Sequence, residues 1–196
     1  MNPENNGLIL SIDIGTNNSC GCYFNPITNK AEIIEYEGSL FVPSFFGYSK
    51  LGKALIGKAA KKAFCDGVSE VIGRAKYLVG KEVNRDSAAF YSEMCGMPVI
   101  VNQQGYCHFH LPKIGIDVDP SELYKRMIKL YVSILENKHI GQVDTIRLTV
   151  PASFTAYQRA LVKHIAEECG FESEKVSIIN EPSAAAYMYW HSEQQD

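Results

Sequence analysis

The sequence predicts an α/β fold in which a mixed β-sheet is flanked by helices. Three observations carry this prediction: two apolar strands form a hairpin near the N-terminus, a long amphipathic helix follows Pro120, and a strand–helix–strand unit spans residues 143–179. A hairpin makes its strands antiparallel, whereas a strand–helix–strand unit makes them parallel. A single sheet that contains both units is therefore mixed.

The N-terminal hairpin carries the first candidate site. Leu8–Ile14 is an apolar run rich in β-branched residues, which is typical of a buried strand, and Cys20 to Phe24 reads as its partner. The loop between them can turn backbone N–H groups toward an anion, because Gly15 allows close approach and Thr16 adds a hydroxyl. Asp13 would repel a phosphate unless a cation such as hydrated Mg²⁺ lay between them. A half-buried aspartate that closes an ordinary hairpin explains the motif equally well.

The next hundred residues contain shorter elements. We expect a strand at 31–36, extended structure at 41–48, a short hairpin at 51–57, a helix at 58–64, an irregular connector at 84–98 and a hairpin made of 99–101 and 106–111. His108 and His110 share one face of that hairpin, but two histidines are too few for a metal site. Lys76 lies among apolar residues, so it is either a solvated surface lysine or a cation directed into a phosphate site.

The C-terminal half has stronger signals. Asp119 is the expected N-cap of a helix with one apolar stripe that runs to about Asn137. A strand at 143–150, a helix at 156–169 opened by a capping box at Thr155, and a strand at 176–179 form the parallel unit. Asn180, Glu181 and Pro182 follow the last strand, and ligands of open α/β sheets bind at such carboxyl ends. Pro182 is expected to begin an Ala-rich helix.

Composition excludes several function classes. The chain has 196 residues, of which 46% are hydrophobic and 21% charged, with a net charge of −3. This balance provides no electrostatic footprint for nucleic acid, and no apolar run approaches the length of a membrane span. The six cysteines are scattered and include no C-x-x-C pair, which favours reduced thiols in a cytoplasmic protein.

Several motifs occur in an order that resembles one family. These are an Asp-Ile-Gly-Thr hairpin, a Val-Pro-Ser strand, a Lys before Leu-Val-Gly, Thr-Val-Pro-Ala-Ser-Phe before Gln-Arg, and Ile-Ile-Asn-Glu-Pro-Ser-Ala-Ala-Ala. Together they resemble the seventy-kilodalton heat-shock chaperones from about Gly7 to Tyr189. The resemblance implies the first lobe of an actin-like (ribonuclease H-like) ATPase domain. We therefore expect the lobe to span residues 7–190, with a disordered N-terminus at 1–6 and a tail at 191–196.

The resemblance also implies roles for individual residues. Lys76 matches the family's catalytic lysine, Asp13 the aspartate near hydrated Mg²⁺, and Glu181 the glutamate that positions Mg²⁺ and water. Gly15, Thr16 and Asn17 match the phosphate loop, and Pro151 and Arg159 match residues that relay nucleotide state to the neighbouring domain. The implied cofactors are ATP or ADP with Mg²⁺. The implied activity of the parent protein is ATP-driven binding and release of unfolded polypeptide, helped by a J-domain co-chaperone and a nucleotide exchange factor.

The chain also departs from the family pattern. Asn17 replaces a second Thr, Leu40 an Arg, and Ala156 an Asp, while Ser177 stands where many members have an Arg implicated in J-domain docking. The last change argues against that docking. The chain ends before the family's second phosphate loop, adenosine pocket and peptide-binding domain, so it is either part of a longer protein or a naturally short relative. We expect these 196 residues alone to be inactive in ATP hydrolysis.

Two other functions stay open. One is a catalytically idle, degenerate paralogue that serves as a chaperone-interaction module, which Asn17, Ala156 and Ser177 favour. The other is a sugar- or acetate-kinase relative that shares the Asp-Gly-Thr hairpin. The Asn-Glu-Pro-Ser-Ala-Ala-Ala run and Lys76 count against the kinase.

Overall fold

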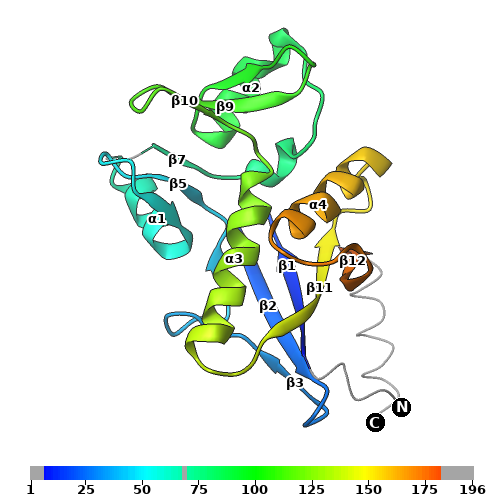
Figure 1. The fold of residues 1–196 in the computed structure, drawn as a ribbon. Helices are drawn as coiled ribbons and strands as arrows, with labels where there is room; N and C mark the ends of the chain where they lie inside the picture. The colour runs from blue at the N-terminus through cyan, green and yellow to red at the C-terminus, as the bar shows by residue number, and fades with distance from the viewer. Residues whose placement is uncertain (1–6, 68–69, 182–196) are drawn as a thin grey trace, which may run out of the picture.

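The main sheet has six strands and is mixed, which confirms the mixed sheet that the sequence predicts. The structure, a computed structural model, describes residues 7–67 and 70–181. The strand order is β12-β11-β1-β2-β3, with β4 also paired to β2 (Figure 1). The strands are β1 (Leu8–Ile14), β2 (Asn18–Asn25), β3 (Lys30–Ile33), β4 (Val42–Pro43), β11 (Val143–Val150) and β12 (Val176–Asn180).

The N-terminal hairpin forms as expected. β1 pairs antiparallel with β2, and every second residue of β1 from Leu8 to Ile14 is buried. β2 begins at Asn18, two residues before the predicted start. The predicted third strand is shorter than 31–36, because β3 ends at Ile33 and Tyr36 forms only an isolated bridge with Ser39.

The strand–helix–strand unit is also confirmed. β11 lies between β1 and β12 and is parallel to both. The connecting helix α4 (Ala156–Glu168) begins with the predicted capping box: the Thr155 hydroxyl accepts from the Gln158 backbone N–H, and the Gln158 side chain accepts from the Thr155 N–H. The short 3-10 helix η2 (Ser173–Lys175) precedes β12.

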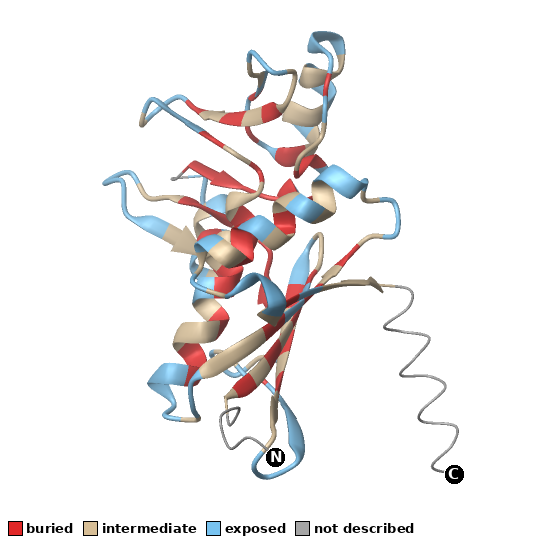
Figure 2. Cartoon of the chain, turned by 45° about the vertical axis from the view of Figure 1, so that its right-hand side comes forward, coloured by how far each residue is buried: buried red, intermediate tan, exposed pale blue. Residues whose placement is uncertain are grey.

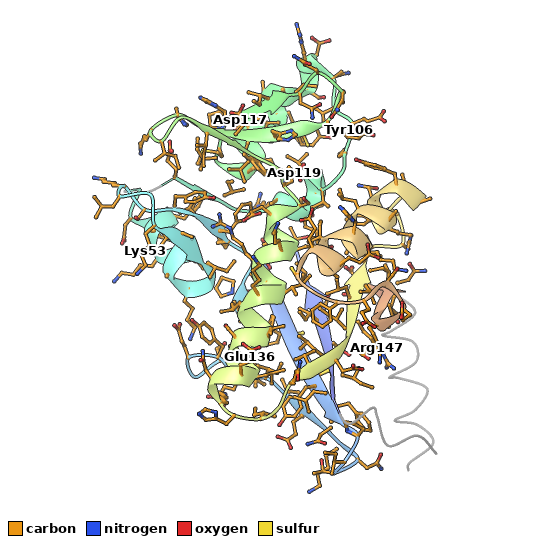
Figure 3. All side chains as sticks on the ribbon, viewed as in Figure 1. Lys53, Tyr106, Asp117, Asp119, Glu136 and Arg147 are labelled. Carbon is orange, nitrogen blue, oxygen red and sulfur yellow. The ribbon has the colours of Figure 1, made fainter. Side chains whose placement is uncertain are left out.

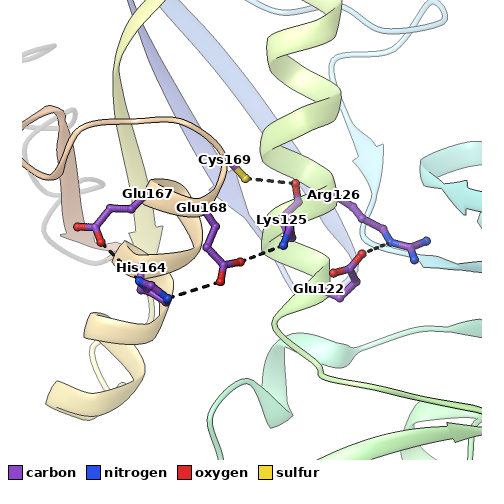
Figure 4. Close-up of polar contacts among 7 residues, drawn as sticks. All are labelled: Glu122, Lys125, Arg126, His164, Glu167, Glu168 and Cys169. Atoms are coloured by element: carbon purple, nitrogen blue, oxygen red, sulfur yellow. Dashed lines mark hydrogen bonds and ion pairs between the residues drawn. The ribbon is translucent and has the colours of Figure 1, made fainter.

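The long helix α3 (Glu122–Asn137) covers the sheet together with α4 (Figure 1). It begins after Ser121 rather than directly after Asp119, whose carboxylate accepts from the Ser121 N–H at 2.7 Å. Lys125 of α3 and Glu168 of α4 form an ion pair at 2.9 Å that joins the two helices (Figure 4). Buried residues concentrate where these helices meet the sheet (Figure 2), which places the main core there.

Two small sheets lie near the N-terminal end of α3, and Arg126 of that helix donates to the backbone oxygens of Gly47 and Leu55 in the first of them. One has the order β6-β5-β7, formed by β6 (Ala54–Ile56), β5 (Phe46–Tyr48) and β7 (Glu70–Ile72), and α1 (Gly57–Cys65) packs against it. The other has the order β10-β9-β8, formed by β10 (Ile116–Val118), β9 (Cys107–Leu111) and β8 (Val99–Val101). The 3-10 helix η1 (Ala75–Leu78) follows β7. The predicted hairpin at 51–57 is instead the turn and second strand of the β5–β6 hairpin.

The predicted irregular connector at 84–98 is wrong, since it contains the helix α2 (Arg85–Cys95). The side chain of Asn84 caps this helix by accepting from the Ser87 N–H at 2.9 Å, and Gly96 ends it in a left-handed conformation. Cys95 is the one fully buried residue of α2, and Ala88, Tyr91 and Met94 on the same side of the helix are partly buried against the core.

Three expectations fall outside the described residues: the N-terminus at 1–6, the Ala-rich helix after Pro182 and the tail at 191–196. Within the described part of the chain, none of the helices has both the length and the apolar character that crossing a bilayer requires.

Candidate functional site

Lys76 lies in the interior of the protein, at the carboxyl end of the main sheet. The chain leaves β7, turns at Arg74 with a left-handed φ of 56°, and enters η1, where Ala75, Lys76 and Leu78 are buried. Lys76 is only 4% exposed, and its ammonium donates to the carboxylate of Glu181, directly after β12. The surface-lysine interpretation is therefore wrong. A lysine this deep needs a partner, and Glu181 provides it.

The loop after β1 is tightly closed. A Cβ added to Gly15 would lie 2.2 Å from the backbone oxygen of Asn18, so only glycine fits here. The backbone oxygen of Asn17 accepts from the Ser44 N–H at 2.9 Å, and the buried hydroxyls of Ser19 and Ser44 lie 2.9 Å apart. These bonds fix the loop against the segment that follows β4. Ser19 and Ser44 were not singled out from the sequence, although Ser44 stands in the Val-Pro-Ser motif.

Asp13 projects from the exposed face at the end of β1. One of its carboxylate oxygens accepts from the Thr149 hydroxyl at 2.6 Å. The two residues lie side by side because Ile12 pairs with Leu148 in the parallel register of β1 and β11. Thr149 was missed by the sequence analysis. Its place one residue before the carboxyl end of a strand next to β1 is the signal that could have identified it.

A cleft of about 630 Å³ brings some of the predicted residues together. Thr16, Lys76, Glu181 and Pro151 line it, whereas Asp13, Gly15 and Asn17 do not. Its other wall is aromatic and includes Tyr77, Phe154, Tyr106 and Tyr157. The rings of the last two stack with centroids 5.2 Å apart, which connects the β8–β10 sheet to α4 (Figure 3, where Tyr106 is labelled).

Pro151 and Arg159, the two predicted relay residues, are in direct contact. The guanidinium of Arg159 donates to the backbone oxygens of Pro151 at 3.3 Å and of Phe154 at 3.1 Å. It thus holds the turn between β11 and α4 in one shape. The neighbouring Gln158 amide donates to the backbone oxygen of Val79 at 2.7 Å, which joins this turn to the segment after η1.

The carboxylates near the cleft do not form a metal cage. Among the residues that the structure describes, no group of three or more His, Cys, Asp or Glu side chains could hold an ion. His110 and His108 instead face Asp117 and Asp119, at 2.7 Å and 3.7 Å, in the β9–β10 region (Figure 3 labels both aspartates). Mg²⁺ keeps several waters and takes few protein ligands, so two separated carboxylates suit it better than a cluster would.

Strand order, flanking helices and the Gly-containing loop after β1 together define one lobe of an actin-like ATPase domain. A family model described as "Hsp70 protein" matches residues 9–196. The chain therefore belongs to the Hsp70 family.

A relative agrees with this assignment. The chain is 28% identical over 184 residues to the chaperone protein DnaK of Buchnera aphidicola subsp. Schizaphis graminum. The match covers 93% of this chain and 28% of that protein. The chain thus spans just over a quarter of the length of the relative that it matches.

Proposed function

We propose that this chain forms the first lobe of the ATP-binding domain of an Hsp70-type chaperone, and that its cleft receives the phosphates of ATP or ADP with Mg²⁺. The observation that supports this most strongly is the buried Lys76, which reaches the cleft that Thr16 and Glu181 also line. Phosphoryl transfer needs charge neutralisation and an aligned water more than it needs a covalent group. The buried Lys76 ammonium would neutralise charge, and the partly exposed Glu181 carboxylate would align the water.

The residues present fit such a ligand. The loop at Gly15 is held in one shape, since a Cβ there would meet the backbone oxygen of Asn18, and the backbone N–H groups of Gly15, Thr16 and Asn17 would donate to a phosphate. Lys76 would neutralise charge on that phosphate, while Asp13 and Glu181 would hold Mg²⁺ through water. Bound Mg²⁺ would supply charge neutralisation and orientation at the phosphates.

We assign the relay of nucleotide state to Pro151 and Arg159. The bond between them makes the turn before α4 rigid, so a shift of Pro151 at the cleft would be carried to α4. In the whole protein this relay would couple the nucleotide to binding of unfolded polypeptide by domains beyond this chain. J-domain co-chaperones and nucleotide exchange factors are the expected partners, although Ser177 argues against J-domain docking.

We further propose a cytoplasmic location. All six cysteines are free thiols, and Cys95 and Cys107 are both buried without forming a disulfide. A protein with six cysteines and no disulfide among them is typical of a reducing compartment.

The second candidate is a catalytically idle module of the same family. It is favoured by the exposed positions of Ala156 and Ser177, where two departures from the family pattern lie on the surface. Such a module would keep the fold and the Lys76–Glu181 pair without turnover in the full-length protein.

Saturation-transfer NMR of Mg·ADP tests the proposal at millimolar concentration, where a single lobe is expected to bind. We expect transfer to the nucleotide from the wild-type chain and from Lys61→Met, a control on the exposed surface of α1, but a clear loss with Lys76→Met. Equal transfer from all three proteins, or none from the wild type, would contradict the assignment.

A further inference from the structure

Tyr124 carries a buried hydroxyl that the fold leaves without a partner. It lies in the first turn of α3, and its residue is 0% exposed. Among the described residues no atom is placed to form a hydrogen bond with this hydroxyl. Buried polar atoms in native proteins almost always have a partner, and ordered water is the usual one where protein atoms are absent.

A second unpartnered atom lies at the same end of the sheet. Asn180 is the last residue of β12, and its side-chain oxygen is buried without a hydrogen bond in the described part of the chain. Asn180 pairs with Val150, so its side chain shares the face of the sheet on which Val150 is fully buried. This is the face that α3 and α4 cover (Figure 1). The two orphan atoms are complementary, since the tyrosine hydroxyl donates and the amide oxygen accepts.

Tyr124 also lies within electrostatic reach of both site carboxylates. Burial raises the pKa of its hydroxyl far above the ordinary value, and the charges of Glu181 and Asp13 raise that pKa further. The hydroxyl therefore stays protonated and remains a donor at any ordinary pH. Tyr131, one heptad further along α3, also has a buried hydroxyl without a partner among the described residues, but Glu181 is not among the groups that raise its pKa, which are burial first and then Cys20 and Asp13.

We propose that the Tyr124 hydroxyl and the Asn180 side-chain oxygen hold an ordered water beneath Glu181, and that Tyr124 is thereby a positioning residue of the site. The water accepts from Tyr124 and donates to Asn180 and to the Glu181 carboxylate. This arrangement satisfies both orphan atoms with the two to four hydrogen bonds that a buried water makes. The Glu181 carboxylate thus accepts hydrogen bonds from two donors, the water and the Lys76 ammonium, and the two together fix its position. The coupling to Glu181 is independent of the proposed function; only the effect on nucleotide binding rests on it.

The matched variants are Tyr124→Phe and Tyr131→Phe. Each removes one buried hydroxyl, which no described protein atom pairs with, from the same face of α3 and keeps the ring, so both variants are expected to fold. The first measurement uses the full chain labelled with ¹³C at the Cζ carbon of tyrosine. In the Glu181→Gln variant we expect the Tyr124 resonance to move and the Tyr131 resonance to stay in place, without any nucleotide.

The second measurement is the affinity for Mg·ADP by NMR titration. Tyr124→Phe should weaken binding about tenfold, which corresponds to about 1.4 kcal/mol, and Tyr131→Phe should leave it unchanged. A Tyr124 resonance that ignores Glu181→Gln, or equal affinities of the two phenylalanine variants for Mg·ADP, would overturn the proposal. If the wild type binds no Mg·ADP but the Tyr124 resonance still responds to Glu181→Gln, the proposed function fails and the ordered-water site stands.

Discussion

Lys76 and Glu181 form an ion pair although 105 residues separate them in the chain. The pair joins η1, which extends from the small β5–β7 sheet, to the carboxyl end of β12 in the main sheet. The ion pair therefore fixes the position of η1, and of the β6-β5-β7 sheet from which it extends, relative to the main sheet. It also places a buried cation and a partly exposed carboxylate at one cleft.

Replacing Lys76 with Met should lower stability. Loss of the cation leaves Glu181 without its partner, but the Glu181 side chain is 35% exposed and can turn to water. We therefore expect a loss of about 1–2 kcal/mol in the free energy of unfolding, below the value for a fully buried pair. Urea denaturation measures it, with the exposed Lys61→Met expected within about 0.5 kcal/mol of the wild type. A Lys76→Met protein as stable as the control would show that the pair contributes nothing to the fold.

Gly15→Ala should distort the loop after β1. The added Cβ would lie 2.2 Å from the backbone oxygen of Asn18, and backbone atoms cannot move aside as a flexible side chain can. We expect a loss of stability of about 2–3 kcal/mol, together with altered amide shifts in residues 15–18. Gly52→Ala is the control, since its Cβ would meet open space and its positive φ of 74° alone should cost about 1 kcal/mol. Equal losses in the two variants would show that the loop is not closely packed.

The Asp144–Lys175 pair predicts a specific dependence of stability on pH. The hydrogen bond from Lys175 is the largest cause that lowers the pKa of Asp144 below its ordinary value of 3.8. A lowered pKa in the folded state means that this contribution is present above about pH 4 and is lost as the pH falls through the folded-state pKa. Since Asp144 is partly exposed, we expect about 0.5–1 kcal/mol. Asp144→Asn should show this deficit at pH 7, and the deficit should shrink as the pH is lowered below about 4. Exposed Asp66→Asn should show none, and a deficit that stays constant with pH would contradict the assignment.

The 196-residue chain on its own should not hydrolyse ATP at a useful rate. In our proposal the chain supplies one wall of a nucleotide site that a second lobe would complete. Each missing donor at such a site removes roughly 3 kcal/mol of transition-state stabilisation, and water at the open face weakens the remaining electrostatic terms. Phosphate release from Mg·ATP, compared with a Lys76→Met control, measures this. Turnover that depends on Lys76, with micromolar affinity, would show that the lobe is self-sufficient.

The elements predicted correctly are those whose signals are local. The alternating burial of β1, the capping box at Thr155 and the stripe of α3 each depend on residues close in sequence. The α2 helix was missed because its apolar side is narrow: Cys95 is its one fully buried residue, and Ala88, Tyr91 and Met94 pack only partly against the core. Its cap, Asn84, was visible in the sequence, but a cap followed by a narrow apolar stripe is a weak signal.

The candidate site was only partly accessible from the sequence. Position along the chain could not show whether Lys76 is buried, because its burial depends on η1 packing above a sheet formed by distant segments. The family resemblance suggested that Lys76 is a site residue, and its contact with Glu181 shows where the side chain lies. The bond from Thr149 to Asp13 and the unpartnered hydroxyl of Tyr124 follow from strand register and helix packing, which no local pattern contains.

In the proposed nucleotide site, the loop after β1 and the Lys76 cleft together form the wall that binds the phosphates. Backbone amide mapping by ¹H–¹⁵N NMR during titration with Mg·ATP tests this most directly. We predict fast-exchange shifts that concentrate at Gly15, Thr16 and Asn17 and that disappear in Lys76→Met. Shifts confined to other parts of the chain, such as the β8–β10 sheet, or unchanged amides at residues 15–17 at millimolar Mg·ATP, would contradict it.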